Sequence, residues 1–207
     1  RDEKDRPTVF AALPKDLPRL ISIGRLDLNS EGLLLLTNDG ALARRLELPA
    51  TGWLRRYKVR VHGIPEPARL TALARGIRID GIDYGPIRVE FERQQGSNAW
   101  LALALREGKN REVRHVLEHL GLAVSRLIRT AYGPFALGEL PRGAADEVKT
   151  HELERFESSL KRSSPGRTAE LPQAVEGVGR PAPRRRRAVS VRRSAPTPSP
   201  SRGGPRK

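Results

Sequence analysis

Apolar and polar positions follow two different periods along most of the chain, and these two patterns predict strands and helices in mixed order. Strict alternation, as in a half-buried strand, runs through residues 55–63, where Tyr57, Val59 and Val61 share one face. The leucine run within residues 32–39 does not alternate, which is typical of a strand buried on both faces. Further strand patterns are found at residues 19–23, 86–94, 98–106 and 124–133.

Helical patterns lie between these strands. Asp39 is the expected N-cap of a helix over residues 41–47, and Asn110 is the expected N-cap of a helix that ends at Gly121. The expected helices are residues 7–13, 41–47, 65–74, 109–121 and 145–160. The strands are joined by hairpins and not by regular helical crossovers, so we predict an α+β fold with flanking helices on a mixed, largely antiparallel sheet.

Composition divides the chain into two parts. The sequence has a net charge of +15, and most of this excess lies in residues 161–207, which are rich in Arg, Pro, Ser and Gly. This segment has too few large apolar residues to offset the entropy of ordering, so we predict one domain over residues 1–160 and a disordered basic tail over residues 161–207. The tail serves either as a solubilising appendage or as a sequence-independent contact to phosphates.

Absent residue types also bear on function. The sequence has no Cys, which excludes a disulfide framework and cysteine-bound metal and fits a cytoplasmic setting. No apolar run approaches the roughly 20 residues of a membrane helix. The sequence has no Met and starts at Arg1, so we expect a fragment or a processed chain.

The segment GRLDLNSEGLLLLTNDG, residues 24–40, places carboxylates and amides directly before the buried strand. Asp27, Asn29 and Glu31 have the spacing of the first ligands of a calcium loop. The twelfth position of such a loop needs a bidentate Glu, and here it is Asn38. The remaining interpretations are a solvated connection between two strands and a catalytic carboxylate on a loop that a buried strand anchors.

A metal site is not predicted elsewhere. His115 and His119 are four positions apart on the expected helix, but the intervening residues lack the Glu of the H-E-x-x-H pattern. The sequence suggests no third ligand, and no glycine-rich phosphate loop is present.

Four segments, in order, resemble the bacterial ribosomal pseudouridine synthases of the subgroup that comprises small-subunit synthase A and large-subunit synthases B, E and F. They are GRLDLNSEGLLLLTNDG, RRYKVRV, EGKNREVRHVLEHLG, and VSRLIRTAYGPF followed by LGELPRGAADEV. The resemblance covers about residues 1–155. Members of this family usually carry an upstream S4 RNA-binding domain and a strand with an NKP.G motif, and neither occurs in this sequence.

The resemblance implies roles for three residues. Asp27 would be the essential carboxylate, Arg114 would form an ion pair with it, and Tyr57 would stack on the uracil base. Taken alone, Tyr57 on a strand is more simply a core aromatic, and Arg114 is more simply part of a solvated helix face. The reaction would need neither a metal nor another cofactor.

The resemblance also implies an RNA partner, either ribosomal RNA or a ribosomal subunit precursor, and a monomeric cytoplasmic enzyme. Arg25, Lys109 and Arg111 would hold phosphates beside the flipped uridine, Asn29 would order the loop, and Asn110 would complete the RNA contacts. The expected product is a pseudouridine, most simply in large-subunit RNA. The alternative is an RNA-binding or ribosome-assembly protein that uses the same scaffold without catalysis.

Overall fold

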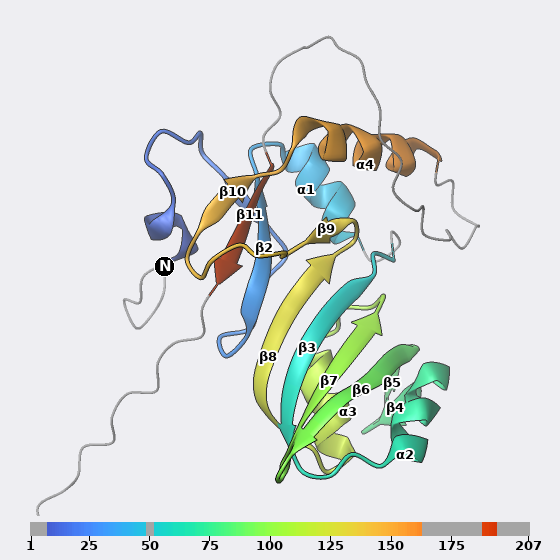
Figure 1. Cartoon of the computed structure of the whole chain (residues 1–207). Coiled ribbons are helices and arrows are strands. Elements are labelled where there is room, and N and C mark those ends of the chain that lie inside the picture. The colour runs from blue at the N-terminus through green and yellow to red at the C-terminus, as the bar shows by residue number, and fades with distance from the viewer. Residues whose placement is uncertain (1–7, 49–51, 163–187, 194–207) are drawn as a thin grey trace, which may run out of the picture.

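The computed structural model describes residues 8–48, 52–162 and 188–193, which form helices around one large, twisted sheet (Figure 1). The helices are η1 (Val9–Ala12), α1 (Gly40–Glu47), α2 (Pro67–Ala72), η3 (Leu73–Arg75), α3 (Glu112–His119) and α4 (Thr150–Arg162). The strands are β1 (Ile21–Ile23), β2 (Glu31–Thr37), β3 (Arg55–His62), β4 (Ile77–Ile79), β5 (Ile82–Tyr84), β6 (Ile87–Gln95), β7 (Asn98–Leu105), β8 (Ala123–Tyr132), β9 (Phe135–Ala136), β10 (Ala145–Glu147) and β11 (Ala188–Arg193).

The main sheet has the strand order β10-β11-β2-β8-β3-β7-β6, with β1 paired to β2 and β9 paired to β8. All of these pairs are antiparallel except β2 with β8. That parallel contact is short and joins Glu31 to Ile128 and Gly32 to Arg129. The predicted α+β class with a largely antiparallel sheet is therefore confirmed.

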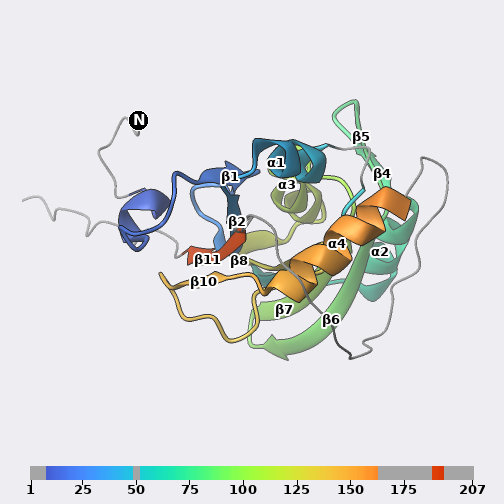
Figure 2. The ribbon, with the colours of Figure 1, turned by 90° about the horizontal axis from the view of Figure 1, so that it is seen from above.

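Two cores cover different parts of the sheet. Near β3 and β7, α3 lies behind the sheet in Figure 1 and packs Val113, Val116 and Leu117 against Val59 and Val61. Near β2 and β8, α1 and α4 supply a second core, and Figure 2 shows α1 beside β1 and β2.

β2 is buried on both faces, as its leucine run predicted. Leu33 and Leu35 belong to the core that α1 and α4 cover, whereas Leu34 and Leu36 pack with residues from the segment before β1. All seven residues of β2 are buried. The strand is therefore a firm support for the polar loop that precedes it.

Local signals placed several elements correctly. The Asp39 carboxylate accepts hydrogen bonds from the backbone N–H groups of Ala41 and Leu42, at 2.9 and 3.1 Å, and caps α1 as expected. A hairpin formed by β4 and β5 was missed, although its Asp80-Gly81 turn between apolar residues is a common hairpin signal.

The predicted N-cap of α3 was wrong. The N-cap is Arg111, in the left-handed region with φ 49°, and not Asn110. The Glu112 side chain reaches back to accept a hydrogen bond from the Lys109 backbone N–H at 2.8 Å. The side chain of a residue within the helix therefore satisfies a backbone N–H at the helix start, and the Asn110 side chain is not needed as a cap.

The C-terminal predictions need two corrections. Helix α4 starts at Thr150 and not at residue 145, because Ala145–Glu147 pair with β11 as strand β10. The prediction of a tail without regular structure is wrong for Ala188–Arg193, which form β11 between β10 and β2. β8 and β1 pair with one edge of β2, and β11 pairs with the other edge, which would otherwise leave its backbone groups unpaired. Residues 163–187 and 194–207 lie outside the described part of the chain.

Candidate active site

The loop of residues 24–30 joins β1 to β2 and carries Asp27. Gly24 has φ 68°, and its N–H donates to the Glu47 carboxylate at 2.7 Å, which ties the start of the loop to α1. The Ser30 N–H donates to the carbonyl of Asp27 at 2.9 Å and closes a turn just before the buried strand. The Asp27 side chain is half-buried and forms no hydrogen bond or ion pair with the described residues.

Arg114 reaches the same loop from α3. Its side chain is 6% exposed, and it donates from Nη2 to the carbonyl of Asn29 at 2.8 Å and from Nη1 to the carbonyl of Val124 at 3.1 Å. Its Nε is buried and has no partner among residues 8–48, 52–162 and 188–193. Arg114 therefore holds the backbone two residues after Asp27.

The predicted Asp27–Arg114 ion pair is not formed in the described part of the chain. The guanidinium of Arg114 is directed at two backbone carbonyls instead. Burial, helped by the charge of Arg111, lowers the pKa of Arg114, and the carboxylate of Asp27 opposes this effect. Asp27 and Arg114 are thus electrostatic neighbours whose connection runs through the loop backbone.

Arg129 on β8 is a second buried arginine at the loop, and the sequence analysis missed it. Its side chain is 4% exposed and donates from Nε to the carbonyl of Leu33 at 2.9 Å and from Nη1 to the carbonyl of Arg25 at 3.2 Å. These two carbonyls lie on either side of Asp27. An Arg on the same strand face as the apolar Leu127 and Ala131 was the signal that could have found it.

The geometry of β2 and β8 explains why Arg129 reaches the loop. Gly32 has φ 104°, and a Cβ added there would lie 2.3 Å from the carbonyl oxygen of Arg129. Only glycine permits this close approach of the two strands. The strands stop pairing after Gly32, and the Arg129 side chain continues the contact by binding the carbonyl of Leu33.

Tyr57 lies directly opposite Arg129 on the neighbouring strand β3. It is half-buried and packs against the core beneath α3, so the simpler interpretation of a core aromatic agrees with its position. Burial raises the pKa of the Tyr57 phenol, and the charge and hydrogen bonding of Arg129 oppose this, as does the charge of Arg55. The hydroxyl therefore keeps its proton near neutral pH.

The other predicted RNA contacts fall around these residues. Arg25, Asn29, Asn110 and Arg111 have exposed side chains, and the carbonyl of Asn29, not its amide, anchors the loop. Lys109 is also exposed but forms an ion pair with Glu107. Lys109 lowers the pKa of Glu107, and any phosphate would have to compete with this carboxylate.

The described residues offer neither a cluster suited to a metal ion nor a helix suited to cross a membrane. In those ranges, no cluster of three or more His, Cys, Asp or Glu side chains could hold a metal ion. His115 contacts the Tyr84 hydroxyl through Nδ1 at 3.3 Å. No described helix has the length and apolar character to cross a membrane.

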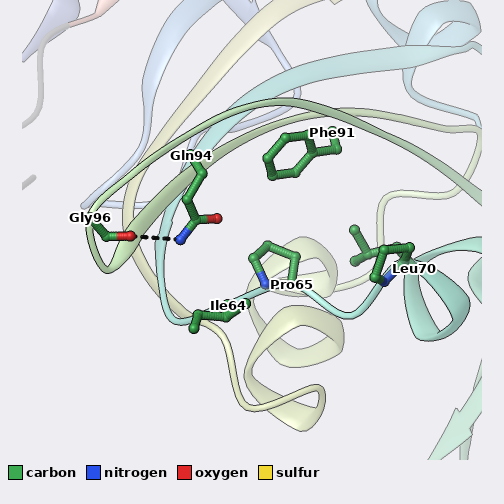
Figure 3. A pocket seen from close by; sticks show the side chains of 7 residues that line it. Ile64, Pro65, Leu70, Phe91, Gln94 and Gly96 are labelled. Atoms are coloured by element: carbon green, nitrogen blue, oxygen red, sulfur yellow. Dashed lines mark hydrogen bonds between the residues drawn. The ribbon is translucent and has the colours of Figure 1, made fainter.

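An apolar hollow of about 450 Å³ lies apart from all of the predicted site residues. Figure 3 shows it between the start of α2 and the β6–β7 hairpin, where Gln94 donates to the Gly96 carbonyl at 2.8 Å. It is lined by Ile64, Pro65, Pro67, Leu70, Phe91, Gln94 and Gly96. The hollow offers no catalytic group, so the site is assigned to the Asp27 loop.

Replacing Glu112 by Gln is expected to flatten the pH dependence of the unfolding free energy. Burial raises the pKa of the Glu112 carboxyl, whose side chain is 3% exposed, against the hydrogen bond from Lys109. The folded state binds this proton more tightly, so stability is highest below the ordinary pKa of about 4.3 and falls as the pH rises through the raised pKa. Gln imitates the protonated form and removes this fall.

Urea unfolding at a series of pH values measures the effect. The control is Glu118→Gln on the exposed face of the same helix, which should keep the wild-type slope. A Glu112→Gln variant with the wild-type pH dependence would show that burial of this carboxyl does not destabilise the fold.

Comparison with known proteins identifies the family of the chain. The family model described as RNA pseudouridylate synthase matches residues 3–119. An uncharacterized RNA pseudouridine synthase of Rickettsia bellii is 51% identical over 148 residues, which are 72% of this chain and 64% of that protein. The ribosomal large subunit pseudouridine synthase B of Escherichia coli is 45% identical over 149 residues, which are 71% of this chain and 51% of that protein.

A solved pseudouridylate synthase structure aligns with a TM-score of 0.64 and 29% sequence identity over 72% of this chain and 65% of that chain. The chain thus spans between half and two thirds of the length of these relatives. The family model covers the loop of Asp27, strand β3 with Tyr57 and helix α3 with Arg114. On these matches, the chain belongs to the RNA pseudouridylate synthase family.

Proposed function

We propose that this chain isomerises a uridine of large-subunit ribosomal RNA to pseudouridine, with Asp27 as the essential carboxylate. One observation carries the proposal: Asp27 is half-buried and unpaired among the described residues, on a loop whose carbonyls two buried arginines hold. A reactive group needs this kind of fixed support, since small displacements slow a reaction greatly. The relative named a large-subunit synthase supports the choice of RNA.

The reaction needs little more than the correct positioning of Asp27 and the uridine. The N1–C1′ bond breaks, the base turns, and C5 bonds to C1′; C5 loses a proton and N1 gains one. Nothing is oxidised or reduced, so the chemistry calls for no cofactor. Asp27 supports this isomerisation by one of two routes, attack on C1′ or removal of the C2′ proton. A deuterium at C2′ distinguishes them, because only the second route slows with it.

The neighbours of Asp27 would position the substrate. The uridine must leave its stack to expose C1′, and the Tyr57 ring would hold the base while its hydroxyl stays protonated. Arg25, Lys109 and Arg111, with Asn29 and Asn110, would contact the flanking backbone from the exposed rim. We propose a monomer in the cytoplasm that acts on ribosomal RNA or a subunit precursor.

Incubation of the 207-residue chain with unmodified large-subunit RNA that carries tritium at C5 of uridine tests the proposal. Tritium should appear in water, and carbodiimide treatment with primer extension should place the pseudouridine at one position. Small-subunit RNA is the control and should stay unmodified. Tight RNA binding without tritium release would favour the non-catalytic alternative, and modification of the small-subunit RNA alone would overturn the choice of substrate.

A further inference from the structure

A row of three arginines and one tryptophan crosses four strands of the main sheet. In register, Arg126 of β8 lies opposite Arg60 of β3, Arg60 opposite Trp100 of β7, and Trp100 opposite Arg93 of β6. We name these four residues the arginine row. It has no part in the arrangement around Asp27.

The arginine row lies on the sheet face opposite α3. Val59 and Val61 of β3 point into the core beneath α3, so Arg60 between them points to the other side. This face is turned toward the viewer in Figure 1, where α4 crosses only the end of the sheet near α1. Arg60 and Arg93 are both exposed. These two arginines are therefore open to a partner, whereas Trp100 and Arg126 are half-buried and Trp100 packs against the second core.

Two carboxylates of this face are already paired, and one of them binds an arginine of the row. Glu31 binds Arg126 at 2.7 Å and also Arg142 at 3.3 Å. Glu92 binds Lys58 at 2.7 Å. Glu90 also faces this side, opposite Ala102.

Among the described residues, Arg60 and Arg93 have no carboxylate partner, and Arg60 stands directly across from another arginine. Like charges directly opposite each other destabilise a sheet. Glu31 offsets the charge of Arg126, whereas Arg60 has no such carboxylate in the described part of the chain.

Trp100 organises the cations around it. Nζ of Lys58 lies 5.5 Å from its ring centroid, and the guanidinium of Arg93 lies 6.0 Å from it. Such contacts fix the direction of a cation without neutralising it. Strands are about 4.8 Å apart, so the Cα atoms of Arg60 and Arg93 are about 10 Å apart, a span that suits successive phosphates of a polymer better than a single small anion.

We propose that the arginine row binds the phosphate backbone of RNA at a segment distinct from the target uridine. The charges that carry the argument are those of Arg60 and Arg93, because Glu92 and Glu31 already offset the charges of Lys58 and Arg126. The inference rests on the proposed action on RNA only for the identity of the polyanion. The row would hold part of the substrate on one sheet face while the Asp27 loop acts on the other.

The test compares Arg60→Ala/Arg93→Ala with Arg69→Ala/Arg75→Ala, which removes two exposed arginines from α2 and η3. Affinity for a large-subunit RNA transcript is measured by filter binding at several salt concentrations. Losing two phosphate contacts should lower the steepness of log K against log salt by about 1.4–1.8. When the salt concentration is raised from 50 to 200 mM, the affinity of the wild type should therefore fall by a factor that is about 7 to 12 times larger than the factor for the variant.

The control should keep the wild-type slope, both proteins should keep the wild-type melting temperature, and the single-turnover rate at saturating RNA should not change. An unchanged slope for Arg60→Ala/Arg93→Ala would overturn the proposal. So would normal binding of naked RNA with lost binding of ribosomal subunits, which would indicate a protein partner. If the row variant loses affinity but the wild type forms no pseudouridine, the row stands and the proposed activity fails.

Discussion

Replacing Asp27 by Asn should abolish pseudouridine formation and leave RNA affinity and thermal stability close to those of the wild type. The amide has the shape of the carboxylate but can neither attack C1′ nor take the C2′ proton. No described residue bonds to the Asp27 side chain, and the loop is held through the carbonyls of Arg25 and Asn29. Loss of such a group lowers the rate by at least about 10⁴-fold.

Single-turnover tritium release measures this effect, with filter binding and thermal melting on the same samples. Asp16→Asn is the matched control, because Asp16 is an exposed carboxylate in the segment before β1. Its rate should equal that of the wild type. Isomerisation at the wild-type rate by Asp27→Asn would remove Asp27 from the mechanism, whatever the binding data show.

Replacing Arg129 by Met is expected to reduce both the rate and the stability. The variant leaves the buried carbonyl of Leu33 and the partly buried carbonyl of Arg25 without their donor. Each such loss costs about 1–3 kcal/mol, so the unfolding free energy should fall by about 2–6 kcal/mol. With the loop no longer held on both sides of Asp27, the single-turnover rate should fall by about 100-fold, since a displacement of about 1 Å has that effect.

If Arg129 only stabilised the fold, its replacement would not lower the single-turnover rate while leaving the RNA affinity of the folded protein unchanged. In the folded Arg129→Met protein, below its melting temperature, RNA affinity should stay near the wild-type value while the rate falls. Arg129→Lys, which keeps the charge, should recover part of the rate. The control is Arg106→Met, which also removes a bond to a backbone carbonyl, that of Gly52 at 2.9 Å, but from an exposed arginine. A stable variant with the wild-type rate would show that Arg129 does not position the loop.

Features set by neighbouring residues could be predicted from the sequence. The cap of α1 depends on Asp39 and the two N–H groups that follow it. The alternation within residues 55–63 places Val59 and Val61 in the core because strand geometry has a period of two. The leucine run of β2 likewise reports burial on both faces.

Two other features could not be predicted from the sequence. Ala145–Glu147 continue a helical pattern in the sequence, yet they form β10 because β11 offers them a partner. The cap of α3 depends on a side chain within the helix, which a search for preceding Asn or Ser residues does not detect. The error at β10 thus reflects a partner distant in the sequence, whereas the α3 cap is a local contact that comes from an unexpected side of the helix start.

The candidate site also has a part that could be predicted from the sequence and a part that could not. The resemblance named Asp27, Tyr57 and Arg114. In the structure, Arg114 and Arg129 bind carbonyls of the Asp27 loop, and Tyr57 lies opposite Arg129. The contacts themselves were not predictable: Arg114 binds the carbonyl of Asn29 and not the Asp27 carboxylate. Arg129 was overlooked because its role depends on two carbonyls about a hundred positions earlier in the chain, beside strands that only the folded sheet brings close.

The place of β11 in the sheet has a consequence for how the chain is made. β2 leaves the ribosome well before β11, its partner along most of its length, because residues 38–187 lie between the two strands. Until then a strand of four successive leucines has an unpaired edge, which is the kind of segment that associates with other chains. Pairs so distant in sequence also form slowly. Completion of the sheet is therefore expected to be a late step in folding, and shielding of β2 until then should reduce association between chains.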